Sequence, residues 1–244
     1  MSHRFFVNHS VEPNVEFELD PGECHHLLNV MRAQTGDAIE LFDGSGMQFA
    51  ARIETISRKR VTVIADPGVE VNREIDFEMV VGIPLPKSDR QKFLVEKCTE
   101  IGVTRLLLLE TARSSVKIAD RTITKLERLV VEASKQCGRN RLLQIEGPKS
   151  LIDVIQDPEF KKDYCRKFAH TAPMTRTAPD AHRKSNAGSS NHCVLIGPEG
   201  GFDPEEVRRC QEHDWEPLSL GKATLRMETA AVVAATLLSR NPAG

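Results

Sequence analysis

The sequence of 244 residues lacks the patterns that mark membrane-spanning, secreted and metal-binding proteins. No apolar run approaches the roughly 20 residues that cross a bilayer, and the start, MSHRFFVNHS, lacks the apolar core of a signal peptide. The six cysteines lie far apart without a CxxC pair, and no HExxH pattern is present. We therefore predict a cytoplasmic protein that contains neither a membrane segment nor a metal ion.

Three motifs of well-known α/β enzymes are absent as well. A classical dinucleotide site requires GxGxxG after a strand, and a nucleotide-triphosphate site requires GxxxxGK followed by Ser or Thr. An α/β-hydrolase requires the nucleophile motif GxSxG. Any ligand site must therefore be built from other residues.

Charge is distributed unevenly along the chain. The net charge of −2 argues weakly against a strongly basic nucleic-acid binder, and residues 1–72 carry six Lys and Arg against eleven Asp and Glu. Residues 112–141, by contrast, carry eight basic side chains against three acidic ones. We call these eight the basic stripe: Arg113, Lys117, Arg121, Lys125, Arg128, Lys135, Arg139 and Arg141. The stripe favours phosphate binding, and the alternative is a solvated helix face.

The first seventy residues alternate short apolar runs with turn signals. They predict strands at 4–7, 16–19, 38–42, 47–56 and 60–65, with a helix at 25–32. The turn Asp43-Gly44-Ser45-Gly46 between two of the strands is a hairpin signal. This pattern predicts a small β-barrel with one helix packed against it, and we place the domain boundary near residue 72, giving domains at 1–72 and 73–244.

Beyond residue 72 the pattern predicts an α/β domain. A strand at 77–83, a helix at 88–101 and a strand at 103–109 form a βαβ unit, hence a parallel sheet. Ser88 and Gln91 are predicted to form a capping box, and Gly102 to end the helix. Further strands are predicted at 142–145, 167–170, 193–196 and 218–220, with helices at 122–137, after Ser150, at 204–213 and at 225–239. A polar loop covers roughly 172–191.

Two glycine-bearing turns late in the chain are candidates for a ligand site. Residues 197–201 read GPEGG and residues 220–225 read LGKATL, and each turn follows an apolar strand and leads into a helix. In a parallel sheet both turns lie at the carboxyl edge, where α/β folds bind ligands, so they can form one pocket. The alternative is that the glycines serve only the geometry of the connections.

A set of motifs spread over nearly the whole chain resembles one known family. These are IGPEGGFDPEE, LGKATLRMETA, KSDRQKFLVEKCTEIGV and EASKQCGRNR, with RFFV and HHLLNVMR near the N-terminus. In this order they resemble the ribosomal RNA small subunit methyltransferase E family of the SPOUT superfamily. The resemblance implies an N-terminal PUA-like β-barrel and a C-terminal SPOUT α/β domain tied in a deep trefoil knot. Periodicity shows no knot, and such folds are rare.

The resemblance also implies an activity. It is the transfer of a methyl group from S-adenosylmethionine to N3 of a uridine in 16S ribosomal RNA, within the small ribosomal subunit, by a homodimer. The cofactor-binding residues that it implies are Ile196, Gly197, Gly201, Leu220, Gly221 and Leu225. The methyl group of such a cofactor is already activated, so the protein has chiefly to position donor and acceptor.

Transfer to uridine N3 requires loss of a proton and stabilisation of the charge that spreads to the carbonyl oxygens. Glu199 and Glu228 are the carboxylates within the motifs, and Arg226 is the arginine beside them, so these three are the catalytic candidates. The structural alternatives are that Glu228 caps its helix or pairs with Arg226. Arg4, Arg113 and Arg139 are candidates for contacts with RNA phosphates or bases.

The sequence departs from the family pattern at Ala223 and Thr224, where a basic and an aliphatic residue are usual, and at Lys135, where an acidic residue is common. The loop at 172–191 is also longer than usual. Two other functions remain open. One is a noncatalytic RNA-binding or ribosome-assembly protein, and the other is a SPOUT methyltransferase that acts on transfer RNA.

Overall fold

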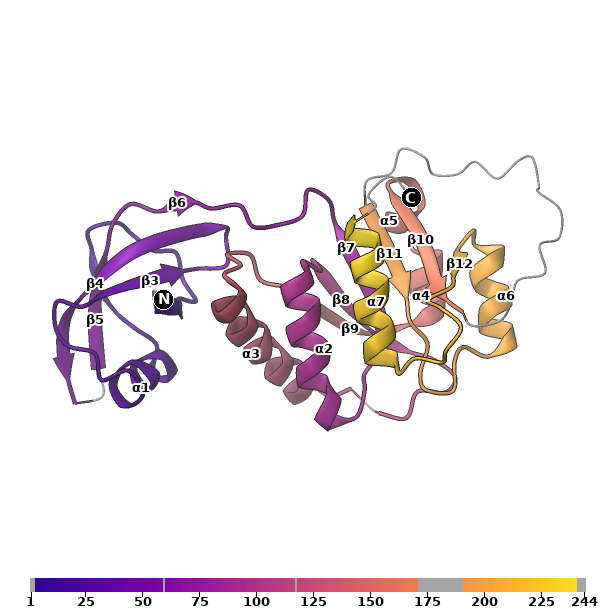
Figure 1. Ribbon diagram of the computed structural model, residues 1–244, viewed down its shortest axis with the longest axis horizontal. Coiled ribbons are helices and arrows are strands. Elements are labelled where there is room, and N and C mark those ends of the chain that lie inside the picture. Colours follow the sequence, from indigo (N-terminus) through magenta and orange to yellow (C-terminus); the bar gives the residue numbers. More distant parts are fainter. Residues whose placement is uncertain (1–2, 59, 117, 171–190, 241–244) are drawn as a thin grey trace. The chain divides into compact units, whose positions relative to one another are not determined.

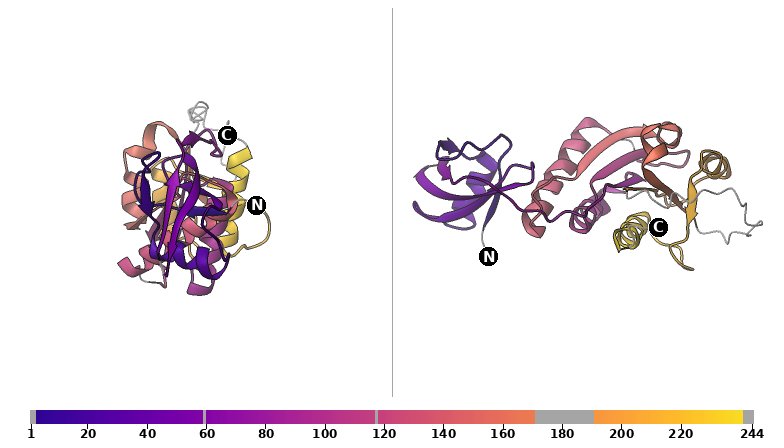
Figure 2. Two further views of the ribbon diagram at one scale, coloured as in Figure 1. Left: turned by 90° about the vertical axis from the view of Figure 1, so that its left-hand side faces the viewer. Right: turned by 90° about the horizontal axis from the view of Figure 1, so that it is seen from above.

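The computed structural model describes residues 3–58, 60–116, 118–170 and 191–240. Two compact units are present, one formed by Met1–Glu74 with Val131–Leu142 and the other by Ile75–Val130 with Leu143–Gly244 (Figures 1 and 2). The predicted polar loop falls outside the described residues, except for Asn191 at its end. Every helix in the described ranges is too short or too polar to cross a membrane.

The first unit is built on a six-stranded sheet. Its strands are β1 (Arg4–Phe6), β2 (Glu16–Glu18), β3 (Ala38–Phe42), β4 (Met47–Ser57), β5 (Arg60–Ala65) and β6 (Val69–Glu70). They pair in the order β1-β3-β4-β5-β2, with β6 on β4, and only the β1–β3 pair among these is parallel. The five longer strands confirm the predicted ones, whereas β6 was missed because two exposed residues carry no periodic signal.

One helix, α1 (Pro21–Asn29), packs against this sheet and contacts β5. Buried side chains on alternate positions of the strands form the core that the helix closes: Phe5, Leu41, Ile53, Val61 and Val63, joined by Leu27 of α1. The prediction of this helix at 25–32 was wrong at both ends. Its first turn contains Pro21, whose fixed φ suits that position, and Arg32 has φ +54°, which no helix continues through.

The C-terminal turn of the long helix α3 (Asp120–Cys137) belongs to the first unit. Arg4 on β1 donates from one terminal nitrogen to the carbonyl of Ser134 at 3.0 Å, and its Nε lies 2.5 Å from Glu40. Lys135 lies 2.9 Å from Glu23, and both side chains are largely buried. These contacts join the C-terminal end of α3 to β1 and α1.

The second unit is an α/β fold on a fully parallel sheet, which confirms the predicted fold class. Its strands are β7 (Met79–Pro84), β8 (Arg105–Glu110), β9 (Gln144–Ser150), β10 (Tyr164–Ala169), β11 (Asn191–Leu195) and β12 (Glu216–Leu218). They run in the order β12-β10-β11-β7-β8-β9. Every residue of β7 is buried, as expected for a parallel strand that is covered on both faces. All carboxyl ends therefore meet at one edge.

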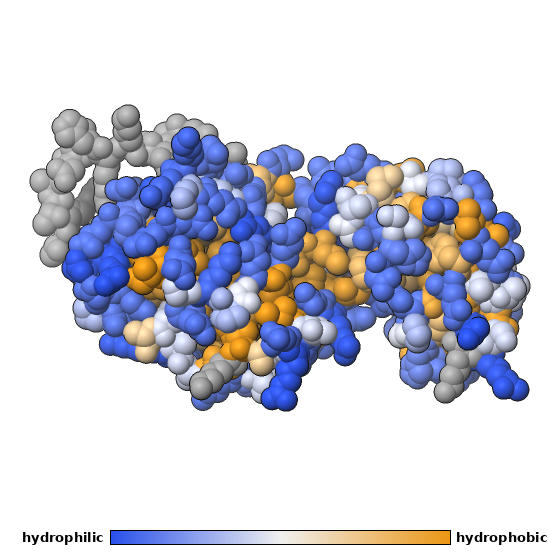
Figure 3. All heavy atoms as spheres, turned by 180° about the vertical axis from the view of Figure 1, so that it is seen from behind, coloured by the Kyte–Doolittle hydropathy of each residue, from blue (hydrophilic) through white to orange (hydrophobic). Residues whose placement is uncertain are grey.

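The remaining helices of this unit are α2 (Ser88–Ile101), α4 (Leu151–Gln156), α5 (Glu159–Lys162), α6 (Pro204–Glu212) and α7 (Met227–Arg240). α7 packs against α2 and contacts β7 and β11, while α4 contacts α6 and β9 (Figure 1). Four buried alanines of α7, at 230, 231, 234 and 235, allow this close approach. The face seen in Figure 3 is mostly hydrophilic, with apolar patches between the charged side chains.

The structure corrects three details of the predicted elements. The helix cap of α2 is Lys87 rather than Ser88, and no side chain caps it; Gln91 donates instead to the carbonyl of Pro86 at 3.0 Å. The end of that helix is as predicted, with Gly102 in the left-handed region at φ 100°. The strand predicted at 142–145 is longer and runs through Pro148 to Ser150. α5 was missed because four residues are too few to show a helical period.

Candidate functional site

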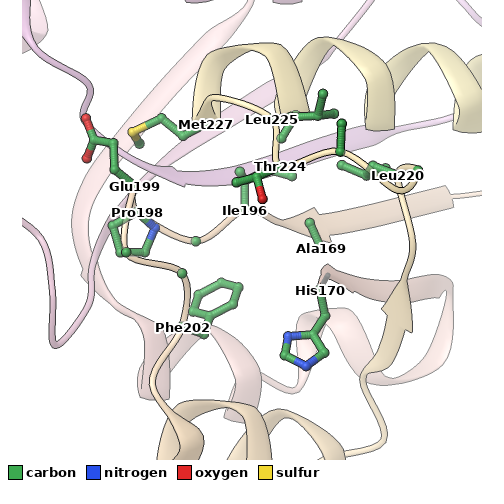
Figure 4. A pocket seen from close by; sticks show the side chains of 16 residues that line it. Ala169, His170, Ile196, Pro198, Glu199, Phe202, Leu220, Thr224, Leu225 and Met227 are labelled. Atoms are coloured by element: carbon green, nitrogen blue, oxygen red, sulfur yellow. The ribbon is translucent and has the colours of Figure 1, made fainter. Parts of the chain in front are cut away.

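The two glycine turns line one pocket of about 280 Å³ at the carboxyl edge of the second sheet (Figure 4). The first turn follows β11, the second follows β12, and the end of β10 supplies Ala169 and His170. Glu199 lines this pocket. So do all six residues predicted to bind the cofactor, which are Ile196, Gly197, Gly201, Leu220, Gly221 and Leu225. The structure thus brings the two glycine turns, which are separate in the sequence, into one pocket.

The first turn is fixed by close backbone packing. A Cβ on Gly197 would lie 2.9 Å from the backbone nitrogen of Phe202, so only glycine fits there. The backbone nitrogen of Ile196 donates to Gly82 at 2.7 Å, and that of Gly201 donates to Pro198 at 2.8 Å. The turn then enters α6, where Asp203 and Glu206 form a reciprocal capping box.

Two glycines leave the pocket open. Gly201 has φ +66° and Gly221 has φ +126°, values that side-chain-bearing residues rarely adopt, and a Cβ on either would meet nothing within 4 Å. The walls around them are largely apolar, with Ile196, Leu225 and the ring of Phe202 labelled in Figure 4. This combination of open glycines and apolar walls is typical of a site for a small organic ligand.

Charged side chains stand at one end of the pocket. Glu199 lines it beside Met227 (Figure 4), and its carboxylate lies 3.9 Å from a terminal nitrogen of Arg90 on α2. The Nε of Arg90 lies 3.5 Å from Glu228 on α7. The side chain of Glu228 is only 6% exposed, and its second oxygen has no hydrogen-bond partner among the described residues.

This arrangement settles the alternatives for Glu228 in part. Its ion-pair partner is Arg90, so the structural alternative in which Glu228 pairs with Arg226 does not hold. Arg226 and Glu228 flank Met227, which lines the pocket, but neither lines it within the described part of the chain. The sequence analysis did not identify Arg90 as a site residue, because it is one of many arginines. The available signal was its position at the start of a helix that follows a buried strand.

Arg113 lies beside the first turn. It follows β8 and donates from a terminal nitrogen to the carbonyl of Gly200 at 2.6 Å, while its side chain is exposed. The neighbouring backbone nitrogen of Ala112 donates to Glu206 at 2.8 Å, which ties the same loop to α6. A residue predicted to contact RNA therefore also braces the pocket. His170, which lines the pocket, was missed because a single histidine at a strand end is not distinctive.

Arg4 and Arg139, the other two residues predicted to contact RNA, lie in the first unit. The side chain of Arg139 is 4% exposed and makes an ion pair with Glu74 at 2.5 Å. The side chain of Arg4 is 9% exposed and pairs with Glu40. Both guanidinium groups are thus already engaged by carboxylates, which is a structural role, and their contact with RNA stays a prediction.

Burial makes three cysteines of the second unit unreactive. Burial raises the pKa of Cys98 to about 12 and that of Cys210 to about 12, so both thiols stay protonated at neutral pH. Burial also raises the pKa of Cys193 well above its ordinary value. In the described ranges, no three His, Cys, Asp or Glu side chains gather closely enough to hold a metal ion.

The chain thus combines a β-rich unit with a parallel α/β unit that has a glycine-lined pocket at the carboxyl edge of its sheet. Comparison with known proteins identifies the class to which this combination belongs. Residues 73–239 match the RNA methyltransferase domain, and residues 19–66 match the RNA methyltransferase PUA domain. The chain belongs to this RNA methyltransferase family.

Individual relatives show which members of the RNA methyltransferase family the chain resembles. The ribosomal RNA small subunit methyltransferase E of Bacillus subtilis is 28% identical over 97% of this chain and 95% of its own length. A protein from Legionella pneumophila, described as a methyltransferase and solved with bound cofactor SAM, is 30% identical with a TM-score of 0.87 over 98% of each chain. The small subunit methyltransferase E of Neisseria gonorrhoeae, solved with S-adenosyl methionine, shares the fold at 22% identity and a TM-score of 0.85, again over 98% of each chain. The resemblance drawn from the motifs is confirmed.

Proposed function

We propose that this protein transfers a methyl group from S-adenosylmethionine to N3 of a uridine in 16S ribosomal RNA, in the cytoplasm. One observation carries the proposal: both glycine turns of the family motifs line a single pocket at the carboxyl edge of the sheet. Relatives with this fold bind the same cofactor. The deep trefoil knot and the domain boundary at residue 72 are part of the proposal.

The pocket residues fit the cofactor. Its volume of about 280 Å³ lies near the lower end of the range for small-molecule sites. The apolar side chains of Ile196, Leu220 and Leu225 suit the adenine ring, and the bare backbone at Gly201 and Gly221 allows close approach. The carboxylate of Glu199 suits the positive charge of the sulfonium and ammonium groups. When bound, the cofactor supplies an activated methyl group.

The chain's own residues have to prepare the acceptor. Of the two candidate carboxylates, Glu199 lines the pocket, so we assign to it the removal of the N3 proton of uridine. Arg226 forms no ion pair with another described residue, and we assign to it the charge that spreads to the uracil carbonyl oxygens. Glu228, which is buried against Arg90, supports them from α7.

The RNA and the second subunit would meet other surfaces. Arg4, Arg113 and Arg139 remain our proposed RNA contacts, and the exposed Arg121, Lys125 and Arg128 of the basic stripe, on α3, are further candidates. We also propose a homodimer, because Leu237 on α7 and Phe93 on α2 are large apolar side chains that are 50% and 42% exposed. Sedimentation equilibrium of the Leu237→Lys variant tests the dimer, and a wild-type monomer would refute it.

Calorimetry with S-adenosylmethionine tests the cofactor site. The Gly201→Val variant places a branched side chain in the pocket at φ +66°, and we expect its affinity to fall at least tenfold, equivalent to about 1.4 kcal/mol. Gly36→Val is the matched control, because Gly36 has φ +91° and equal free space but lies in the first unit.

The two variants share the backbone strain, so only the position of the added side chain differs between them. Unchanged affinity in Gly201→Val, or equal loss in both variants, would contradict the assignment of the pocket. Absence of cofactor binding in the wild type at millimolar concentration would instead favour a noncatalytic RNA-binding protein.

A further inference from the structure

Three charged side chains from three separate elements form a line that ends at the pocket. Glu228 belongs to the first turn of α7, Arg90 to the first turn of α2, and Glu199 to the first glycine turn. The distances are 3.5 Å from Arg90 to Glu228 and 3.9 Å from Arg90 to Glu199. Exposure rises along the line, from 6% for Glu228 through 25% for Arg90 to 44% for Glu199.

The buried end of the line fixes its middle. A carboxylate as buried as Glu228 requires a cation, and among the described residues Arg90 is the cation within ion-pair distance. The other charge close to this guanidinium is Asp89, whose side chain is 74% exposed and lies 3.9 Å away, so solvent weakens its attraction. The position of Arg90 is therefore set mainly by Glu228.

The exposed end of the line needs such support. Glu199 stands on a turn rather than on a helix or strand, and a half-exposed glutamate can adopt several rotamers. A catalytic carboxylate loses efficiency when it is displaced by about 1 Å, at a cost on the order of 100-fold in rate. A fixed guanidinium on one side of the carboxylate restricts that movement.

Resting on the proposed function, we infer that Arg90 is a positioning residue for methyl transfer. Anchored by Glu228, it holds the carboxylate of Glu199 at the edge of the pocket, where the proton of the acceptor base is removed. Arg90 is not among the described residues that line the pocket, and in this proposal it acts through Glu199.

Kinetics of a double-variant set test this inference. We expect Arg90→Gln to lower kcat by about 10- to 100-fold while the KM values for RNA and cofactor stay within about threefold, and Arg90→Lys to recover part of the loss. In the Glu199→Gln background, Arg90→Gln should lower kcat little further, because the residue through which it acts is already disabled. Losses that multiply in the double variant would overturn the inference.

Hydrogen exchange provides a second readout that needs no methyl transfer. In Arg90→Gln, backbone amides of residues 199–201 should exchange faster than in the wild type, whereas Lys92→Gln should change nothing there. Lys92 is the matched control because it lies on the same helix, is 68% exposed and pairs only with Glu96 at 3.5 Å among the described residues. Equal exchange of 199–201 in Arg90→Gln and wild type would refute the positioning role.

The two readouts separate the inference from the proposed function. A wild type that methylates no RNA would refute the proposed function, while the exchange experiment would still decide whether Arg90 holds the turn. If Arg90→Gln does not fold, Glu228→Gln, which removes the negative charge of the anchor and keeps its size, replaces it in both experiments with the same expected directions.

Discussion

At the scale of single residues, one arginine of the second unit joins several carboxylates in an ionic network. Arg105 on β8 is 12% exposed and contacts Glu146 at 2.6 Å, Glu78 at 3.2 Å and also Glu159. Tyr164 donates to Glu78 at 2.5 Å, which extends the network to β10. Removing such an arginine leaves several carboxylates without their partner, so the network is costly to break.

We expect Arg105→Met to lower the free energy of unfolding at pH 7 by about 3 kcal/mol, the low end for breaking a buried pair because the partners are partly exposed. Urea denaturation measures this change in the free energy of unfolding. It can be followed by the fluorescence of Trp215, which is buried in this unit and is the only tryptophan of the chain. Lys92→Met, which removes an exposed pair, is the control. A loss below about 0.5 kcal/mol, the size of an exposed pair, would contradict this role of Arg105.

The same network makes stability depend on pH. The hydrogen bond from Arg105 lowers the pKa of Glu146 below its ordinary value of 4.5. The stabilisation is therefore present above pH 4.5 and is lost as the pH falls through the lower pKa of the folded state. As the pH falls below 4.5, the wild type should therefore lose stability more steeply than Arg105→Met. Parallel acid slopes would contradict this contribution.

Residue-level prediction from the sequence was easiest in the two glycine turns. The resemblance to the family named Gly201 and Gly221, both of which line the pocket with positive φ, and their binding of the cofactor stays a prediction. Charged residues were harder, because an arginine or glutamate carries no local signal of its partner. The pairing of Glu228 with Arg90 joins residues far apart in the sequence, and only the packing of α2 against α7 brings them together.

At the scale of elements, the cap of α6 links helix stability to the pocket. The backbone nitrogen of Glu206 donates to the carboxylate of Asp203 at 2.7 Å, and Asp203 directly follows Phe202, which lines the pocket. Ser150 caps α4 in the same way, accepting from the nitrogen of Asp153 at 3.1 Å, and does not line the pocket. The two caps form a matched pair for experiment.

We expect Asp203→Ala and Ser150→Ala each to lower the free energy of unfolding by about 1 kcal/mol, the usual value of such a cap. Only Asp203→Ala should weaken S-adenosylmethionine binding, because only that cap fixes the end of the first glycine turn. Urea denaturation and calorimetry measure the two effects. Equal cofactor affinity in both variants would show that the cap does not support the turn.

Most helices and strands could be predicted from the sequence, and the short elements that were missed share a cause. Long periodic segments such as α2 and α3 were found because an apolar stripe repeats along them. Short elements such as β6 and α5 hold too few residues for a period, and tertiary contacts create them. The helix predicted from residue 25 in fact begins at Pro21, since proline suits the first helical turn.

At the scale of the whole molecule, the parallel sheet explains why distant motifs act together. Parallel strands place all their carboxyl ends at one edge, so turns that follow β11 and β12 meet there. That consequence could be drawn from the sequence once the βαβ unit was found. The order of the strands, with β11 between β10 and β7, could not, because no local pattern encodes which strands become neighbours.

The two compact units also qualify the idea of a single domain boundary. Residues 131–142 join the first unit although they follow a long segment of the second, so α3 contributes to both. The contacts of Arg4 with Ser134 and of Lys135 with Glu23 hold this segment within the first unit. The domain boundary at residue 72 therefore stays a prediction. A change in composition along the sequence cannot show that a later segment, here residues 131–142, packs in the first unit.

The most direct test of the proposed function is methyl transfer to ribosomal RNA. Small ribosomal subunits without the modification would be incubated with the protein and S-adenosylmethionine, and the RNA nucleosides then analysed by mass spectrometry. We predict 3-methyluridine in 16S ribosomal RNA with the wild type, and a rate lowered at least about 100-fold with Glu199→Gln. Cofactor binding without a methyl group in 16S ribosomal RNA, or a methyl group found instead in transfer RNA, would contradict the account.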